Sequence, residues 1–170
     1  FEWVFEDPAV MAVEKLDGTN VSIFMDRGQL IGLNNRTNPI QFDVLSKNKF
    51  IDGVRAAHEK NRVPLASGQH FGELMGPKIQ SNFLKLTSPM WFSFEYLQKH
   101  VSYRSFHQYP KTFENLSKWF RDDLFSLVYA KLHKGEKVKP EGIVFTHPDG
   151  RVAKLRVDMF DWYDGPQHGR

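Results

Sequence analysis

The sequence predicts an α+β protein built mainly from antiparallel strands. Three observations support this class: short alternating apolar and polar segments early in the chain, a hairpin-like stretch over 141–157, and an amphipathic segment over 112–134. The chain of 170 residues has the length of one ordinary domain, and its 15 Phe, 5 Tyr and 4 Trp are enough for a substantial core. We therefore expect one ordered domain over residues 1–170.

Five segments have the alternation or the flanking turn residues that are typical of strands. Asp26-Arg27-Gly28 predicts a hairpin turn between the second and the third of them, because glycine readily adopts the positive φ that tight turns need. The five predicted strands are residues 10–13, 19–25, 29–33, 69–74 and 91–97.

Two segments have helical spacing. The first covers 44–61, although Gly53 within it costs about 1 kcal/mol relative to alanine. The second covers 112–134, where apolar residues recur at intervals of three and four. The lysine-rich connector after it predicts a solvated loop or, alternatively, a rim that faces an anion. Its lysines are Lys131, Lys134, Lys137 and Lys139.

The last two predicted strands, over 141–145 and 151–157, flank the turn sequence His147-Pro148-Asp149-Gly150, in which we expect His147 to be exposed. A turn of two or four residues pairs odd positions of the first strand with even positions of the second, and paired residues share a face. We therefore expect a face with one carboxylate and two cations, which is either an exposed salt-bridge ladder or the floor of a phosphate or metal site. The predicted face holds Glu141, Ile143, Phe145, Lys154 and Arg156, and the opposite face holds Val144, Ala153 and Leu155.

The composition excludes several kinds of site. The chain has no cysteine, which rules out disulfides, thiolate catalysis and cysteine-ligated metals, and its seven histidines lack zinc-type spacing. The formal charge of +3 permits an anionic partner without requiring one. No apolar run approaches the roughly 18 residues of a membrane span, and no signal segment is recognisable, so we expect a cytoplasmic protein without a membrane partner.

Lys15 follows the first predicted strand and precedes Asp17 and Gly18. Gly18 permits a sharp turn, which would leave Lys15 at the strand end with Asp17 and Asn20 close by. The pattern is short enough to arise by chance, and a lysine that faces solvent before a turn is the simpler interpretation when this segment is taken alone.

Four further segments change that interpretation, because all five together resemble the motifs of one family. They match, in order, motifs I, III, IIIa, IV and V of the covalent nucleotidyltransferase superfamily, which includes ATP-dependent DNA ligases, RNA ligases and mRNA capping enzymes. The details favour RNA ligases of the nick-sealing kind, because Lys15 is followed by Gly18-Thr19-Asn20 and because Asn34–Asn38 is similar to a segment of that branch. The five segments are Glu14–Asn20, Phe71–Leu74, Phe92–Leu97, Glu141–Phe145 and Val152–Arg156.

This resemblance implies an α+β nucleotidyltransferase fold, the ATP-grasp-like fold of DNA and RNA ligases, in which two antiparallel sheets flanked by helices hold the nucleotide between them. It implies an adenylyltransferase domain over 1–170 without a C-terminal OB or accessory domain, because 14 residues follow Arg156. The implied reaction is ATP-dependent RNA ligation with Mg²⁺ or Mn²⁺: AMP is carried covalently on Lys15 and passes to an RNA 5′-phosphate, and a 3′-hydroxyl then seals the strand. The RNA is nicked or single-stranded, and we expect the protein to be a monomer.

The resemblance also implies roles for single residues. Lys15 is the implied nucleophile, and Lys154 and Arg156 are the implied cations that stabilise the phosphate charge. Glu141 and Asp17 are the implied metal ligands, since Mg²⁺ prefers hard oxygen donors. The other implied contacts are Glu14 with the adenine amino group, Glu73 with the ribose, Phe94 or alternatively Phe92 stacked on the purine, and Asn20 and Arg36 with a terminal phosphate or sugar of the nucleic acid. Core packing is the alternative role of Phe94.

Two other readings of the function stay open in the sequence. An ATP-dependent DNA ligase or an mRNA capping guanylyltransferase carries the same motifs. A non-catalytic RNA- or nucleotide-binding domain would keep the fold without the chemistry. The presence of Lys15 together with Glu73, Glu141 and Lys154 favours an enzyme, because a binding domain does not need the nucleophile.

Overall fold

The computed structural model describes residues 1–41, 43, 47–108 and 112–166. The chain forms two compact units: Phe1–Leu16 together with Gln98–Arg170 make the first, and Asp17–Leu97 make the second. Each unit contains one antiparallel sheet, so the predicted α+β class with two antiparallel sheets and flanking helices is confirmed. No helix in the described part of the chain is long and apolar enough to cross a membrane.

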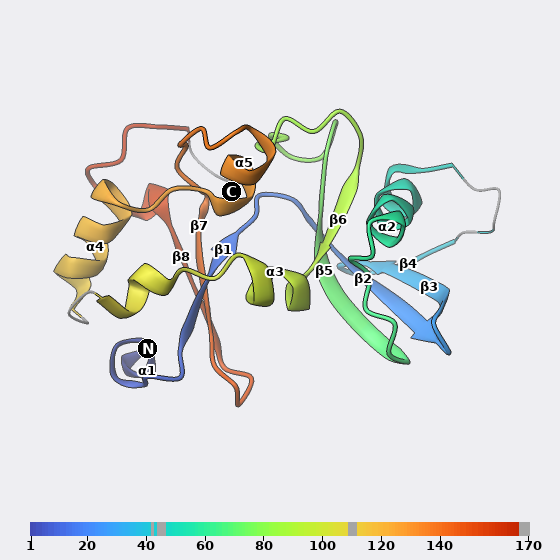
Figure 1. Ribbon diagram of the computed structural model, residues 1–170, viewed down its shortest axis with the longest axis horizontal. Coiled ribbons are helices and arrows are strands. Elements are labelled where there is room, and N and C mark those ends of the chain that lie inside the picture. The colour runs from blue at the N-terminus through green and yellow to red at the C-terminus, as the bar shows by residue number, and fades with distance from the viewer. Residues whose placement is uncertain (42, 44–46, 109–111, 167–170) are drawn as a thin grey trace. The chain divides into compact units, whose positions relative to one another are not determined.

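The sheet of the first unit has the order β1-β7-β8 (Figure 1). One face of this sheet packs on an aromatic core, in which the Phe145 ring lies 5.3 Å from Phe106 and Trp119 is fully buried. The strands are β1 (Met11–Lys15), β7 (Gly142–Thr146) and β8 (Val152–Arg156). The helices are α1 (Glu2–Glu6), η1 (Arg104–Gln108), α4 (Phe113–Asp122), α5 (Leu127–Leu132) and η2 (Val157–Met159), and α3 (Phe94–His100) runs from the second unit into the first.

The single helix predicted over 112–134 is wrong, because the structure contains two helices with a break between Asp123 and Ser126. Ser126 caps the second helix, since its hydroxyl accepts a hydrogen bond from the Tyr129 amide at 3.0 Å. Lys139 closes the end of the first helix from a distant part of the chain. Both groups satisfy backbone atoms that a continuous helix would have satisfied itself.

The predicted pairing of the β7–β8 hairpin is also wrong. The loop between the paired residues His147 and Arg151 has three residues, and its last residue, Gly150, has φ +93°. Compared with a loop of two or four residues, a loop of three residues shifts the pairing by one residue. Each residue of β8 then lies on the opposite sheet face from the one predicted relative to β7. Lys154 therefore pairs with Val144 and Arg156 with Gly142, while Ile143, Phe145, Ala153 and Leu155 share the core face.

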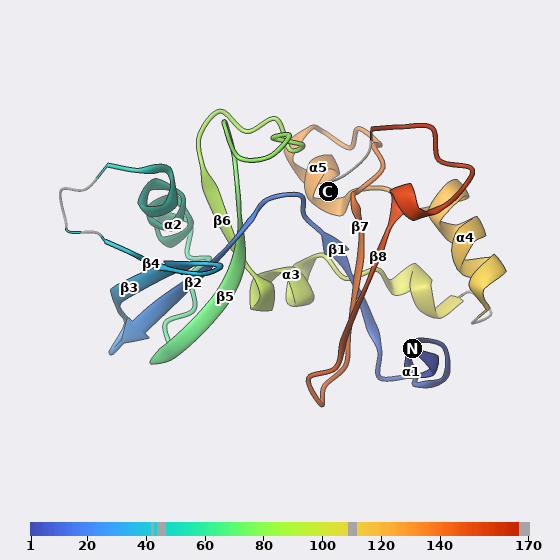
Figure 2. The same cartoon turned by 180° about the vertical axis from the view of Figure 1, so that it is seen from behind.

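The sheet of the second unit has the order β4-β3-β2-β5-β6, and α2 packs on one face of it (Figures 1 and 2). A Cβ on Gly53 of α2 would collide with the Leu74 side chain of β5, which explains a glycine inside this helix. The elements are β2 (Thr19–Asp26), β3 (Gln29–Asn35), β4 (Pro39–Ile40), α2 (Lys49–Glu59), β5 (Gly68–Met75) and β6 (Met90–Ser93).

These elements confirm the predicted strands at 10–13, 19–25, 29–33 and 69–74, and the predicted hairpin between the second and third of them. The predicted helix over 44–61 is present from Lys49 to Glu59, and residues 44–46 lie outside the described residues. The strand predicted over 91–97 is only partly correct. It ends at Ser93, whose hydroxyl accepts a hydrogen bond from the Tyr96 amide at 3.0 Å and so starts α3.

Candidate active site

Lys15 is the last residue of β1, and its Nζ lies 2.5 Å from Oε1 of Glu141. The two side chains are 21% and 5% exposed, so the ion pair is mostly shielded from water. Gly142 lies opposite Lys15 in the register, and a Cβ there would collide with the backbone of β8. Glycine at position 142 therefore allows β8 to lie close to β7 at the point where β7 pairs with Lys15.

Three cations share one face of the first unit's sheet. The register aligns Lys15 with Gly142 and Arg156 across the three strands, and it aligns Val13 with Val144 and Lys154 in the adjacent row. Cβ atoms alternate between faces along a strand, so Lys15, Lys154 and Arg156 point to the same side. The predicted face is only partly correct: Lys154 and Arg156 share a face, but Ile143 and Phe145 lie on the opposite one, and Glu141, just before β7, contacts Lys15.

The two motif V cations differ in their surroundings. Lys154 is exposed, whereas the Arg156 Nε lies 3.0 Å from Oδ1 of Asp158, a side chain that is only 1% exposed. A buried carboxylate that holds the guanidinium limits the positions that the Arg156 side chain can adopt. This face thus carries Arg156, which is held by Asp158, and the exposed Lys154 next to the Lys15–Glu141 pair. Such a group of charges is suited to binding a phosphate.

Glu14 lies on the opposite face of β1 and is 1% exposed. Its carboxylate accepts hydrogen bonds from the Ser126 hydroxyl and from the amides of Leu127, at 2.7 Å, and Val128, at 3.0 Å. Burial raises the pKa of Glu14, and these hydrogen bonds act in the opposite direction. The predicted contact of Glu14 with adenine is therefore corrected: its carboxylate joins the start of α5 to β1, behind Lys15.

In the second unit, Asn20 of β2 and Glu73 of β5 lie directly opposite each other in the register. Both side chains are partly exposed, and they lie on the sheet face away from α2, because the α2 contact at Leu74 is on the other side of β5. Phe71 lies on the same face as Glu73 and is 50% exposed. Phe71 belongs to the segment that resembles motif III, but its exposure beside Glu73 was not predicted from the sequence.

The aromatic residues of motif IIIa do not share a strand face as predicted. Phe92 lies on β6 and is 2% exposed, which makes it a core residue. Phe94 is the first residue of α3 and is 38% exposed. Phe94 therefore has the exposure that stacking on a base requires, and the alternative of Phe92 is excluded by its burial.

Asp17 and Arg36 also belong to the second unit. Oδ2 of Asp17 accepts a hydrogen bond from the Ser81 hydroxyl at 2.8 Å. Arg36 is exposed in the β3–β4 turn, which is organised by Asn35, whose side-chain oxygen accepts from the amides of Thr37 and Asn38. Among the residues that the structure describes, no three His, Asp or Glu side chains are grouped as metal ligands, so the pairing of Asp17 with Glu141 stays a prediction.

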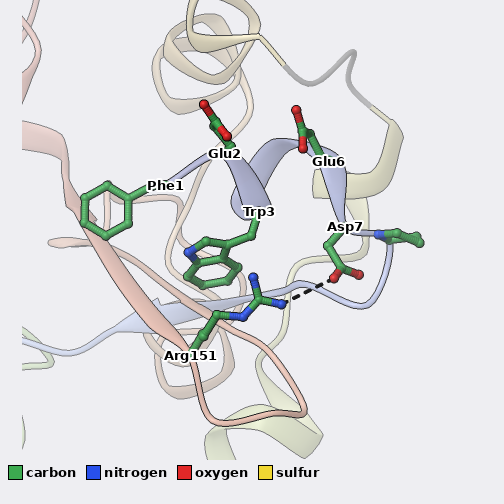
Figure 3. Close-up of a pocket in the computed structure, with 7 residues that line it drawn as sticks. Phe1, Glu2, Trp3, Glu6, Asp7 and Arg151 are labelled. Carbon is green, nitrogen blue, oxygen red and sulfur yellow. Dashed lines mark hydrogen bonds and ion pairs between the residues drawn. The ribbon is translucent and has the colours of Figure 1, made fainter.

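The predicted exposure of His147 is wrong, because the side chain is 12% exposed. Its ring nitrogens lie 2.9 Å from a carboxylate oxygen of Asp7 and 2.7 Å from one of Asp149. Backbone and side-chain hydrogen bonds from Arg151, opposed by burial, hold the pKa of Asp149 at about 2. The same Arg151 lies 5.0 Å from the Trp3 ring and reaches Asp7 (Figure 3).

A cavity of about 750 Å³ lies beside this cluster. It is open, and none of its lining residues carries a predicted role in the chemistry. The Arg151 guanidinium lies over the Trp3 ring, so it covers a face of that ring on which a ligand would stack (Figure 3). The cavity is lined by Phe1, Glu2, Trp3, Glu6, Asp7, Pro8 and Arg151, and Lys15 is not among these residues.

Two lysines of the connector, Lys131 and Lys139, bind backbone carbonyls of the protein. Lys139 donates hydrogen bonds to three backbone carbonyls at distances of 2.7–3.0 Å, and Lys131 donates one to the His100 carbonyl at 2.8 Å. Lys137 lies 5.2 Å from the Phe125 ring. Lys131, Lys134 and Lys137 are exposed, so the predicted solvated loop describes most of the connector, whereas Lys139 is bound inside the first unit.

A family model described as RNA ligase matches residues 8–160. No curated protein matches the chain. Among solved structures, a ligand-free variant of a Naegleria gruberi RNA ligase is 18% identical, with a TM-score of 0.61 over 93% of this chain and 52% of that chain. A variant of that ligase with ATP and manganese is 17% identical, with a TM-score of 0.58 over 93% and 53%. The chain spans about half the length of these ligases and shares their nucleotidyltransferase-type fold, as the sequence predicted.

Proposed function

The chain belongs to the RNA ligase family, and from this premise we propose that residues 1–170 are the adenylyltransferase domain of an ATP-dependent RNA ligase. The observation that carries the proposal is the position of Lys15: its Nζ is held by Glu141 at 2.5 Å on the sheet face that bears Lys154 and Arg156. A lysine with its own carboxylate, beside cations that suit a phosphate, is the arrangement that lysine adenylylation needs.

In the first step, the Lys15 amine attacks the α-phosphorus of ATP. An N–P bond forms, the bond from the α-phosphorus to the bridging oxygen breaks, and pyrophosphate leaves with that bonding pair. The amine loses its protons in the process, and the Glu141 carboxylate is within reach to accept one of them. Lys154 and Arg156 stabilise the negative charge that grows on the phosphate oxygens.

The donor set around Lys15 fits a divalent cation, because Mg²⁺ and Mn²⁺ bind one or two carboxylates together with nucleotide phosphates and water. Glu141 is the carboxylate of the first unit that is close to the nucleophile, and Asp17 is the second proposed ligand. When bound, the cation neutralises phosphate charge and assists the departure of pyrophosphate. The ligand-bound Naegleria ligase contains ATP and manganese, which supports this choice.

The nucleotide contacts are proposed for residues of the second unit. Glu73 binds the ribose hydroxyls, since a carboxylate accepts two hydrogen bonds readily. Phe94 stacks on the purine with its exposed ring. Asn20, opposite Glu73, and the exposed Arg36 bind the terminal phosphate or sugar of the RNA.

Two further steps complete the proposed reaction. An oxygen of the RNA 5′-phosphate attacks the phosphorus of lysyl-AMP, which frees Lys15 and forms a 5′-to-5′ pyrophosphate bond. The 3′-hydroxyl of the other RNA end then attacks the 5′-phosphate, and AMP leaves. The substrate is a nicked or single-stranded RNA with these two ends, and the enzyme acts as a monomer.

The proposal is tested by incubating the protein with Mg²⁺ and α-labelled ATP and measuring label that survives denaturation. We expect label on the wild type and on Lys118→Ala, an exposed α4 lysine, but none on Lys15→Ala. A wild type that stays unlabelled while folded refutes the proposal. Label from GTP alone indicates a capping enzyme, and transfer of AMP to a DNA end but not to RNA indicates a DNA ligase.

A further inference from the structure

Residues 76–88, which make up most of the loop between β5 and β6 (Figure 1), have an unusual backbone. Four of its non-glycine residues lie in the left-handed region, where a Cβ is in steric conflict with the backbone. Such positions normally favour glycine, so four of them within eight residues make this a strained segment. They are Lys78 (φ +60°), Gln80 (φ +46°), Asn82 (φ +47°) and Lys85 (φ +51°).

The loop is nonetheless held firmly. Three successive turns are closed by hydrogen bonds from the amides of Ile79, Asn82 and Lys85 to the carbonyls three residues earlier, at 3.1, 3.1 and 2.8 Å. The side chains of Ile79 and Leu84 are almost fully buried and anchor the loop. Backbone strain persists only where the surroundings impose it in this way, and such strain is concentrated at functional sites.

The loop presents positive charge. Residues 76–88 contain two lysines and neither aspartate nor glutamate. Lys49, at the start of α2, donates a hydrogen bond from Nζ to the Lys78 carbonyl at 3.2 Å, which places a further cation beside the loop. Lys49 and Lys78 are exposed, and neither has a carboxylate of a described residue within ion-pair distance.

One contact ties the loop to the segment after the nucleophile. The Ser81 hydroxyl donates to Asp17 at 2.8 Å, two residues beyond Lys15 in the chain. Two of the connector lysines, Lys131 and Lys139, are bound to backbone carbonyls. Lys49 and Lys78, which are both exposed, are thus better placed to meet an anionic partner than Lys139 is.

We propose that the 76–88 loop, together with Lys49, is a preorganised contact for the phosphate backbone of the RNA substrate. The choice of RNA rests on the proposed function. Charge complementarity supports a phosphate backbone as the occupant, and a cation on a rigid loop loses little freedom on binding. Lysine at position 78 is otherwise unexplained, because glycine would relieve the strain without loss of a described side-chain interaction.

This last point supplies the experiment. Lys78→Gly removes the charge and relieves the strain, so its effects on folding and on RNA binding should have opposite signs. We expect an equal or higher melting temperature, weaker binding of a nicked RNA duplex, and a salt dependence of log K that is shallower by about 1. The matched control is Lys134→Gly: Lys134 is also exposed, with φ +53°, and we expect the same thermal effect with unchanged RNA binding.

A second variant protects the test from a folding defect. Lys78→Gln keeps a side chain in the same strained backbone, and we expect it to weaken RNA binding in the same way. RNA affinity and salt slope that are unchanged in both Lys78 variants overturn the proposal, as does a loss that Lys134→Gly reproduces. An effect on a DNA duplex but not on RNA also overturns it.

Binding is measured without ATP or metal, and labelling of Lys15 is measured separately in the same preparations. We expect Lys78→Gly to be labelled like the wild type. A wild type that is not labelled refutes the adenylyltransferase function, whereas a Lys78→Gly variant that binds RNA normally refutes only the loop contact. The two failures are thereby distinguished.

Discussion

Lys139 provides the sharpest test of how the structure uses its connector lysines. Its ammonium donates to the carbonyls of Phe120 at 2.8 Å, Arg121 at 2.7 Å and Leu124 at 3.0 Å, and it lies 4.4 Å from the Phe125 ring. These carbonyls are at the end of α4, where a helix leaves acceptors without partners. The perturbation is Lys139→Met, which keeps most of the aliphatic stem and removes the donor.

The magnitude follows from these contacts. A hydrogen bond to a charged group contributes about 1.5–3 kcal/mol when considered alone. The three bonds share one ammonium, and the freed methionine regains side-chain entropy, so we expect a net loss of about 2–3 kcal/mol in the free energy of unfolding. For a chain of this length the melting temperature then falls by about 4–12 °C.

The assay is urea unfolding at neutral pH, monitored by far-UV circular dichroism, with calorimetry to check the melting temperature. Lys137→Met is the matched control, because Lys137 lies 5.2 Å from the same Phe125 ring without the three carbonyl contacts, and we expect a change below about 0.5 kcal/mol. If Lys139→Met were as stable as this control and instead weakened RNA binding, the capping role of Lys139 would be refuted.

Three further predictions concern the two sheets. Gly53→Ala should lower the free energy of unfolding by about 1–3 kcal/mol in urea, despite the better helix propensity, because its Cβ meets the Leu74 side chain; a stabilised variant would contradict the packing described. Burial raises the pKa of Glu14, so the unfolded state releases this proton at lower pH than the folded state does, and wild-type stability should fall as pH rises above the ordinary glutamate range. The free energy of unfolding of Glu14→Gln, measured in urea over a pH series, should not show this decrease. If the wild type and Glu14→Gln had the same pH dependence, Glu14 would not be the group responsible. Lys154→Ala and Arg156→Ala should each slow labelling of Lys15 by about 10²-fold, measured as the rate of label incorporation at saturating ATP, and unchanged rates would remove them from the chemistry.

Local sequence signals determined most of the strands. Alternation over 19–25 and 29–33 with an intervening glycine turn depends on neighbours within a few residues, and the β2–β3 hairpin formed as predicted. The helix over 112–134 failed because its break depends on Lys139, which is 17 residues beyond the end of α4 in the chain. No spacing rule within the segment contains that information.

The candidate site shows the same division. The motif around Lys15 predicts that this residue is the nucleophile, and the resemblance names Glu141, Lys154 and Arg156 as its charged neighbours. The predicted pairing placed Lys154 and Arg156 on the face of Ile143 and Phe145, but the three-residue loop puts these two pairs on opposite faces. Glu14 was misassigned because its partners, Ser126 to Val128, lie more than 110 residues away in the chain.

By itself, the sequence determined the fold class and the charged residues expected around Lys15, and the absence of cysteine excluded a thiolate nucleophile. These properties depend on residue type and local spacing, which the chain carries directly. The tertiary structure decided which charges are available: Lys139 and Glu14 are bound inside the first unit, whereas Lys154, Lys49 and Lys78 remain exposed. Whether a charge faces a ligand or a backbone group depends on distant partners, because only folding brings these groups within hydrogen-bond distance.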